Sequence, residues 1–185
     1  MGKKVTDGHY LRRITAVSLL TALFAVSSYI QLPMAIPVTL QTFVLSMCLS
    51  LCGTSLTFKM LAVYTVAGCI GIPVFSSFRA GISVLLEPTG GYILGFFLMT
   101  LCYGVLQKVL PCFRMKNQIT ALVSLVPLYV CGSVWYALVY LKGNYAGVWA
   151  VVWVCVLPYI VPDAVKVLLG SLCAVKLKKH SMVIR

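Results

Sequence analysis

Acidic residues are almost absent from this sequence: among 185 residues there are only three, Asp7, Glu87 and Asp163. Charged residues of either sign make up 10% of the chain, against about a quarter in a typical soluble domain. Hydrophobic residues make up 61%. Such a chain has too little polar surface to cover a globule in water, so we predict an integral membrane protein. Its length suits a single domain over residues 1–185.

Further absences exclude classes of function. The sequence has no GxxxxGK[ST] motif, so the chain cannot bind ATP in a P-loop by itself. Its two histidines, His9 and His180, lie in the polar tails, which excludes an intramembrane Ser-His-Asp site and an HExxH metal site. The eight cysteines include no CxxC pair, and we interpret them as packing residues. We therefore predict that the protein is not an enzyme and carries no metal or cofactor of its own.

What the sequence does contain is a series of apolar runs. Crossing the hydrocarbon core of a bilayer takes about 20 apolar residues in a helix. Six runs approach this length, at residues 14–30, 38–52, 58–72, 90–106, 119–141 and 162–175. Two other stretches, 73–88 and 147–158, are interrupted by polar residues or too short to cross. We expect an all-α membrane fold of six transmembrane helices.

The distribution of basic residues indicates how these helices are oriented. The 15 Lys and Arg residues give a formal net charge of +12. Six crossings with both termini in the cytoplasm place twelve cations inside, leave Arg79 and Lys142 outside, and put Lys166 within a span. This asymmetry follows the positive-inside rule. We therefore predict a cytoplasmic N-tail at 1–13, an outer lid loop at 73–89 and a basic cytoplasmic C-tail at 176–185.

Two ionisable residues fall inside the last predicted span. Pro162 suits the first position of a helix, so we expect the span to begin there. Asp163 and Lys166 are three residues apart, so they share one helical face about one turn below the outer surface. Ionisable groups at such depth often mark a substrate path. The alternative is that the aspartate caps the helix and the lysine extends to the interface.

The outer segment 73–92 offers groups that complement this pair. It supplies the donors Ser77 and Arg79, together with the aromatic residues Phe75 and Tyr92. A pocket built from these groups would suit a small amphipathic ligand with a carboxylate and an amide-like ring. Glu87 lies in the same loop, either exposed to solvent or paired with Arg79. We assign the three tryptophans, Trp135, Trp149 and Trp153, to an interfacial belt.

The first apolar run carries small residues at four-residue spacing. Ser18 is followed by Ala22, and Thr21 by Ala25. Such pairs let another helix approach closely. The partner is either a second protein or another helix of the same chain.

Four sequence blocks resemble the BioY family, the biotin-specific substrate-binding (S) components of energy-coupling factor (ECF) transporters. These blocks are IPVTLQT at 36–42, GIPVF at 71–75, PTGGYILGF at 88–96 and PYIVPDAVK at 158–166. They occur in the order typical of the family and are spread over most of the chain. Two departures are Glu87, where the family often has a small residue, and residues 76–79, which replace a Gly- and Asn-rich stretch.

The resemblance implies a six-helix S component that captures biotin from outside a prokaryotic cytoplasmic membrane. It implies ligand contacts from Asp163 and Lys166, from Tyr92 and Gly91 in the PTGGY block, and from a lid containing Phe75, Ser77 and Arg79. It also implies a transmembrane coupling protein, docked on the small-residue face of the first helix, and ATPase subunits that supply the energy.

Two other functions are consistent with the residues themselves. One is a secondary carrier for a small carboxylate-bearing vitamin, driven by an ion gradient, in which only Glu87 or Asp163 would serve as the ion site. The other is a structural subunit that binds no vitamin.

Overall fold

The computed structural model describes residues 2–32, 37–113, 115–141, 151, 153 and 156–183, most of them in helices. The long helices are α1 (Gly2–Tyr29), α2 (Gln41–Cys52), α3 (Thr54–Cys69), α5 (Gly90–Val109), α6 (Lys116–Val123), α7 (Leu125–Leu141) and α9 (Leu157–Val183). Four short elements connect them: the strands β1 (Gln31–Leu32) and β2 (Val38–Thr39), the 3₁₀ turn η1 (Ser76–Phe78) and α4 (Ser83–Leu86).

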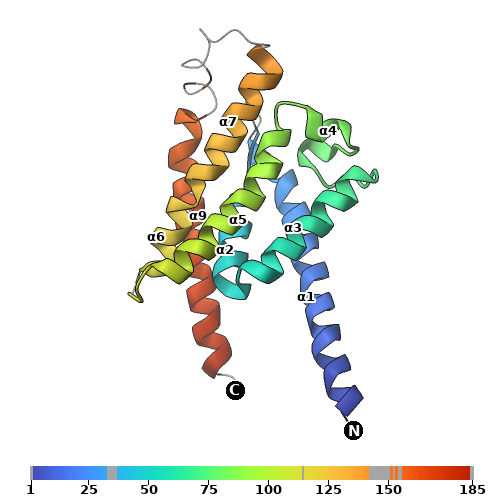
Figure 1. Ribbon diagram of the computed structural model, residues 1–185, viewed down its shortest axis with the longest axis vertical. Coiled ribbons are helices and arrows are strands. Elements are labelled where there is room, and N and C mark those ends of the chain that lie inside the picture. The colour runs from blue at the N-terminus through green and yellow to red at the C-terminus, as the bar shows by residue number, and fades with distance from the viewer. Residues whose placement is uncertain are drawn as a thin grey trace.

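The helices form one bundle in which α2 packs along α9, α5 along α7, and α1 against α3. Both chain termini lie at the same end of the bundle, and α4 lies towards the opposite end (Figure 1). At the centre, the buried ring of Phe24 meets the edges of Tyr64 and Phe96, at centroid distances of 4.8 and 5.6 Å. These contacts join α1, α3 and α5 into one core.

The outward surface of the bundle is apolar, as a lipid-facing surface must be. Large apolar side chains such as Leu19, Leu138 and Leu169 are exposed on three different helices. Within the described residues, three stretches are long and apolar enough to cross a membrane: Tyr10–Tyr29, Gly90–Val109 and Lys116–Val139. The prediction of a helical, membrane-embedded chain agrees with this architecture.

The helices extend beyond the first and last predicted spans, and the predicted start of the last helix at Pro162 is wrong. The first helix begins at Gly2, so the N-tail placed at 1–13 is helical from its second residue, and residues 176–183 of the C-tail continue α9. The last helix begins at Leu157, and Pro162 lies inside it. Pro158 occupies the first turn, where a missing N–H costs no hydrogen bond. The prediction failed because the sequence offers two prolines, and the first of them starts the helix.

Three other boundaries also differ. The run at 38–52 begins as strand β2, which pairs antiparallel with β1 so that Gln31 lies opposite Thr39. The β-branched Val38 and Thr39 favour this extended backbone. The third run, predicted at 58–72, is α3 from Thr54 to Cys69. The run at 119–141 divides into α6 and α7 at Ser124, three residues before Pro127, whose missing N–H cannot continue the helical ladder.

Candidate functional site

A cavity of about 70 Å³ lies among the N-terminal ends of α2, α5 and α9, beneath the loop that contains η1. The elements that enclose it are far apart in sequence, because Tyr64 of α3 and Tyr129 of α7 line it together with these three helix starts. The lining residues are Pro37, Val38, Thr39, Gln41, Thr42, Tyr64, Phe75, Ser76, Val84, Thr89, Tyr92, Ile93, Phe96, Leu128, Tyr129, Tyr159 and Asp163.

The carboxylate of Asp163 is the charged group of this cavity, and it is only 8% exposed. Its Oδ1 accepts a hydrogen bond from Thr42 Oγ1 at 3.1 Å, and its Oδ2 accepts one from Tyr129 OH at 2.7 Å. The partners come from α2 and α7, so three helices meet at one carboxylate. A buried charge is costly unless it is hydrogen-bonded and paired, and this one is both.

Lys166 supplies the opposite charge. Its Nζ lies 2.5 Å from Asp163 Oδ1 and donates a hydrogen bond of 2.8 Å to the backbone carbonyl of Thr39. The lysine therefore connects α9 to the β1–β2 hairpin and adjoins the cavity through Asp163. Because Asp163 lies in the second turn of α9, it does not cap the helix, and that alternative is excluded.

Aromatic side chains form the walls. Phe75 is almost fully buried, and its ring meets Tyr64 edge-on at 5.5 Å. It also fills the space beside Gly68, where a Cβ atom would lie 2.1 Å from Phe75 Cζ. Tyr64 OH accepts a hydrogen bond of 2.9 Å from Gln41 Nε2. The cavity thus combines flat apolar walls with a few fixed polar groups, which is the usual composition of a small-molecule site.

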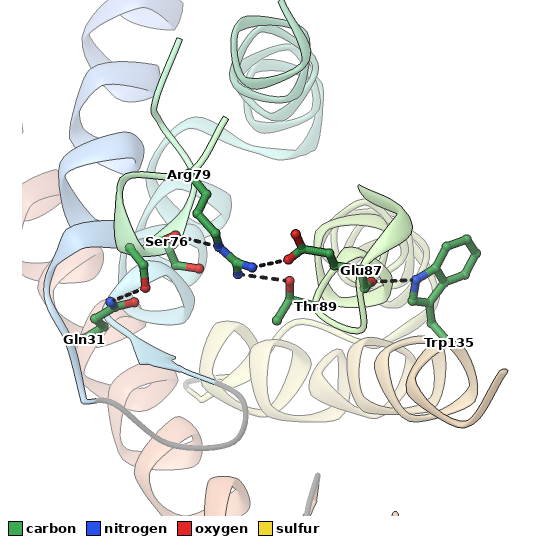
Figure 2. A network of polar contacts seen from close by, with 7 residues as sticks. Gln31, Ser76, Arg79, Glu87, Thr89 and Trp135 are labelled. Atoms are coloured by element: carbon green, nitrogen blue, oxygen red, sulfur yellow. Dashed lines mark hydrogen bonds and ion pairs between the residues drawn. The ribbon is translucent and has the colours of Figure 1, made fainter. Parts of the chain in front are cut away.

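The loop over the cavity is held by a polar network centred on Arg79 (Figure 2). Arg79 pairs with Glu87 and donates to Thr89 Oγ1 at 3.3 Å and to the carbonyl of Ser76 at 3.3 Å. The sequence allows Glu87 either to be exposed to solvent or to pair with Arg79; the structure shows the pair, with both side chains partly exposed.

Two more contacts attach this loop to its neighbours, and Figure 2 shows both. The indole Nε1 of Trp135, on α7, donates to the carbonyl of Glu87 at 3.0 Å. Gln31 Nε2, on β1, donates to Ser77 Oγ at 2.8 Å. Ser77 and the following Phe78 both have positive φ, near 60°, a conformation that residues other than glycine adopt rarely. The loop is therefore fixed to both the hairpin and α7.

The predicted site residues fall into three groups. Phe75, Tyr92 and Asp163 line the cavity, and Lys166 adjoins it through Asp163. Ser77 and Arg79 belong to the covering loop and do not line the cavity.

Gly91 does not line the cavity either: a Cβ atom there would lie 2.2 Å from Trp135 Cβ, so this glycine serves the close approach of α5 to α7. Trp135, predicted to lie in an interfacial belt, is partly buried and donates to the carbonyl of Glu87, whereas Trp153 is exposed. Trp149 and Lys142 lie outside the described residues.

The four small residues of α1 divide between two faces. Thr21 Oγ1 lies 3.4 Å from the carbonyl of Met60 on α3, and Ala25 is buried. This pair packs within the chain. Ser18 and Ala22 are exposed on the other face of the helix.

Sequence reasoning missed the two hydroxyl partners of Asp163, Thr42 and Tyr129, and the wall residues Gln41 and Tyr64. A polar side chain inside an apolar helix indicates a hydrogen-bond partner elsewhere in the protein. The sequence does not indicate which polar groups form a pair. Within the described residues, no group of three or more His, Cys, Asp or Glu side chains is placed to hold a metal ion.

Comparison with known proteins agrees with this architecture. The model of the BioY family matches residues 1–182. A probable biotin transporter BioY from Pyrococcus horikoshii is 32% identical, over 92% of this chain and 98% of its own length. The biotin transporter BioY of Thermotoga maritima is 29% identical, over 91% of this chain and 97% of its own.

A solved structure has a similar fold. The S-component for biotin from an ECF-type ABC transporter superposes with a TM-score of 0.78, covers 94% of each chain and shares 18% of its residues. At that identity the likeness concerns the arrangement of the helices.

Proposed function

This chain belongs to the BioY family, and from that premise we propose that it binds biotin and takes part in its uptake as the S component of an ECF-type transporter. The observation that carries the proposal is the buried Asp163, held by Thr42 and Tyr129 in the wall of an aromatic cavity. A transporter subunit needs such a site and no catalytic group.

The chemistry of biotin matches these side chains. Its ureido ring presents N–H groups, which a carboxylate accepts in strong charge-assisted hydrogen bonds. Its valerate carboxylate is an anion, which the ammonium of Lys166 can hold. The flat apolar walls of Phe75 and Tyr92 suit the fused rings. We assign these four side chains to the ligand, and Ser77 and Arg79 to the lid that covers it.

We further propose that the single domain crosses the cytoplasmic membrane of a prokaryote six times, with both termini inside. Twelve of the 15 cations then lie on the cytoplasmic side, in line with the positive-inside rule. The position of both termini at one end of the bundle supports an even number of crossings. Residues 73–89 then form the outer lid, and 1–13 and 176–185 are the cytoplasmic tails.

The energy for uptake would come from partner subunits, a transmembrane coupling protein and ATPases. The exposed pair Ser18 and Ala22 is the face of α1 that we assign to the coupling protein, because small residues let a partner helix approach closely. Co-purification of the coupling protein should fail with Ala22→Leu and persist with Val130→Leu, which enlarges an exposed residue of α7.

An ion-coupled carrier remains the alternative. It needs a carboxylate that can take up the coupled ion, and Glu87 and Asp163 are each already paired with a cation. Proteoliposomes without ATPases should therefore accumulate no biotin when a proton or sodium gradient is imposed.

The direct test of the proposal is calorimetric titration of the purified full-length protein with biotin. We expect a Kd in the nanomolar range for biotin and no detectable heat with pentanoate, which carries the acid chain without the ureido ring. A folded protein that releases no heat with biotin would contradict the proposal.

A further inference from the structure

The threonine that precedes helix α5 does not use its hydroxyl group to cap that helix. A threonine at this position commonly caps the first turn with its side chain, but Thr89 makes no such hydrogen bond. Its Oγ1 instead accepts a hydrogen bond of 3.3 Å from Arg79 Nη2. Thr89 also lines the cavity, together with Asp163 of α9. Its side chain therefore has a role other than starting the helix.

The bond with Arg79 leaves the hydrogen of this hydroxyl to be donated. A hydroxyl group has one hydrogen to donate and two lone pairs that accept, and a guanidinium only donates. Arg79 therefore occupies one lone pair of Thr89 Oγ1. Thr42 and Tyr129, which also line the cavity, donate their hydrogens within the protein, to the carboxylate of Asp163. Thr89 differs from them because it is the acceptor in its bond.

Glu87 holds the arginine in position for this bond. Figure 2 shows the guanidinium of Arg79 between the carboxylate of Glu87 and the hydroxyl of Thr89. The carbonyl of Ser76 accepts a further hydrogen bond of 3.3 Å from Arg79 Nε. A hydroxyl that accepts from a cation becomes a stronger donor, because the hydrogen bonds of a chain polarise one another. The network therefore both orients Thr89 and strengthens it as a donor.

The backbone around Thr89 is fixed as well. Its carbonyl accepts a hydrogen bond of 3.1 Å from the N–H of Tyr92, and the N–H of Gly90 donates to the carbonyl of Glu87 at 2.9 Å. Helix α4 comes close to this turn, because a Cβ atom at position 90 would lie 1.9 Å from the carbonyl oxygen of Leu85. The hydroxyl is therefore held at the cavity wall before a ligand binds.

The proposed function leaves one polar atom of biotin without an assigned partner. The N–H groups of the ureido ring are assigned to Asp163, and the valerate carboxylate is assigned to Lys166. The ureido carbonyl oxygen is a hydrogen-bond acceptor, and an acceptor that loses water without gaining a donor weakens binding. A fixed hydroxyl with a hydrogen to donate suits this oxygen.

We infer that the hydroxyl of Thr89 donates to the ureido carbonyl of the ligand, and that Arg79 orients and polarises this hydroxyl. The inference rests on the proposed function, because it concerns the same cavity and the same ligand. Thr89 then determines specificity for the ureido ring by direct contact. Arg79 and Glu87 are positioning residues that act through Thr89.

The test compares three ligands by calorimetric titration of the full-length protein. Biotin carries both the ureido carbonyl and the acid, and biotin methyl ester carries the carbonyl without the acid. In iminobiotin a guanidinium replaces the ureido group at neutral pH, so a nitrogen that only donates takes the place of the carbonyl oxygen.

The variants change one hydroxyl group at a time. Thr89→Val removes the hydroxyl and keeps the shape of the side chain, whereas Thr89→Ser keeps the hydroxyl. Thr15→Val makes the same change at an exposed position of α1 and serves as control. Thermal unfolding of each variant checks that it is folded.

We expect Thr89→Val to bind biotin and its methyl ester about three- to tenfold more weakly, the scale of one hydrogen bond. The loss for iminobiotin should be clearly smaller, because the hydrogen of Thr89 finds no acceptor there. Thr89→Ser and Thr15→Val should retain the wild-type affinities. Arg79→Gln should weaken the binding of biotin less in the Thr89→Val background than in the wild type, because part of its effect passes through Thr89.

Four results would contradict the inference in whole or in part. Equal losses for biotin and iminobiotin would give Thr89 a structural role only, and a loss that disappears with the methyl ester would assign its hydroxyl to the carboxylate. Wild-type affinity for biotin in Thr89→Val would leave the carbonyl to another donor of the cavity. Equal effects of Arg79→Gln in both backgrounds would exclude Arg79 as a positioning residue. A wild-type protein that binds no biotin would instead contradict the proposed function, so the two failures are distinguishable.

Discussion

Tyr129 on α7 donates a 2.7 Å hydrogen bond to the carboxylate of Asp163 on α9, 34 positions later in the sequence. The contact fixes one carboxylate oxygen, while Thr42 and Lys166 engage the other. The carboxylate is therefore oriented before any ligand arrives. Preorganisation of this kind lowers the cost of binding, because the side chain loses little further freedom.

Asp163→Asn keeps the shape of the side chain and removes its charge. We expect biotin to bind at least tenfold more weakly, because a hydrogen bond to a charged group contributes about 1.5–3 kcal/mol. Calorimetry measures the change. Glu87→Gln, which neutralises the carboxylate of the covering loop, is the comparison and should raise the dissociation constant by no more than about fivefold. Equal affinities in Asp163→Asn and wild type would remove Asp163 from the site.

Lys166→Ala should also weaken the binding of biotin by tenfold or more, since the valerate carboxylate loses its counter-charge. The substitution should weaken the binding of biotin methyl ester much less, because the ester carries no charge for the lysine to hold. Lys176→Ala, on an exposed position of the same helix, serves as control. An equal loss of affinity for biotin and for its methyl ester would mean that Lys166 supports Asp163 and does not contact the ligand.

Tyr129→Phe deletes one hydroxyl and retains the ring. It leaves Asp163 Oδ2 without its donor in a buried site, and an unsatisfied buried polar group costs about 1–3 kcal/mol. We expect a lower midpoint of thermal unfolding in the absence of ligand. Tyr10→Phe, at an exposed position of α1, should leave the midpoint unchanged. Identical midpoints for the two variants would show that the hydrogen bond does not stabilise the fold.

Gly91→Ala should destabilise the protein through the contact between α5 and α7. The new methyl group would lie 2.2 Å from Trp135 Cβ, which sits next to the backbone and cannot move without shifting its helix. Overpacking of this kind costs about 1–3 kcal/mol. Gly104→Ala is the comparison, because there the methyl group meets only the end of the Thr54 side chain, at 2.9 Å. The midpoint of thermal unfolding should be clearly lower for Gly91→Ala than for Gly104→Ala.

The pair of Arg79 and Glu87 should control how fast the ligand leaves. Glu87→Gln loosens the covering loop, so we expect biotin to dissociate roughly two- to fivefold faster, the scale of a partly exposed ion pair. Chase experiments with labelled biotin measure the rate. Arg79→Gln should act similarly, and the double variant should be no faster than the single ones. Additive effects of the two substitutions would mean that the residues act independently.

The fold class could be predicted from the sequence because composition and run length are averages over many residues and depend on no single contact. The predicted boundaries are wrong where the start of an element depends on a contact with another segment of the chain. Pro162 suits the first position of a helix, but α9 begins at Leu157, with Pro158 in its first turn. The segment 38–52 is one apolar run in the sequence, but Val38 and Thr39 pair as a strand with residues 31–32. Such pairings are set by tertiary contact and leave no periodic trace.

The charged residues of the site could be predicted from the sequence, whereas the residues that supply its hydroxyl groups could not. Asp163 and Lys166 were found because ionisable residues in an apolar run are rare. Thr42 and Tyr129 were missed because Thr and Tyr are common in membrane helices, and nothing in the sequence brings positions 42 and 129 to position 163. Gly91 was assigned to the site from its motif, whereas in the structure it packs against α7.

The hydrogen bond from Lys166 to the carbonyl of Thr39 leaves a donor of the ammonium for the ligand. An ammonium has three N–H groups, and the carbonyl of Thr39 and the carboxylate of Asp163 accept two of them. A ligand carboxylate can therefore bind Lys166 while the lysine still joins the hairpin to α9, the helix that runs the length of the bundle to the terminal end. We expect the hairpin and α9 to stay attached to each other in both the empty and the occupied protein.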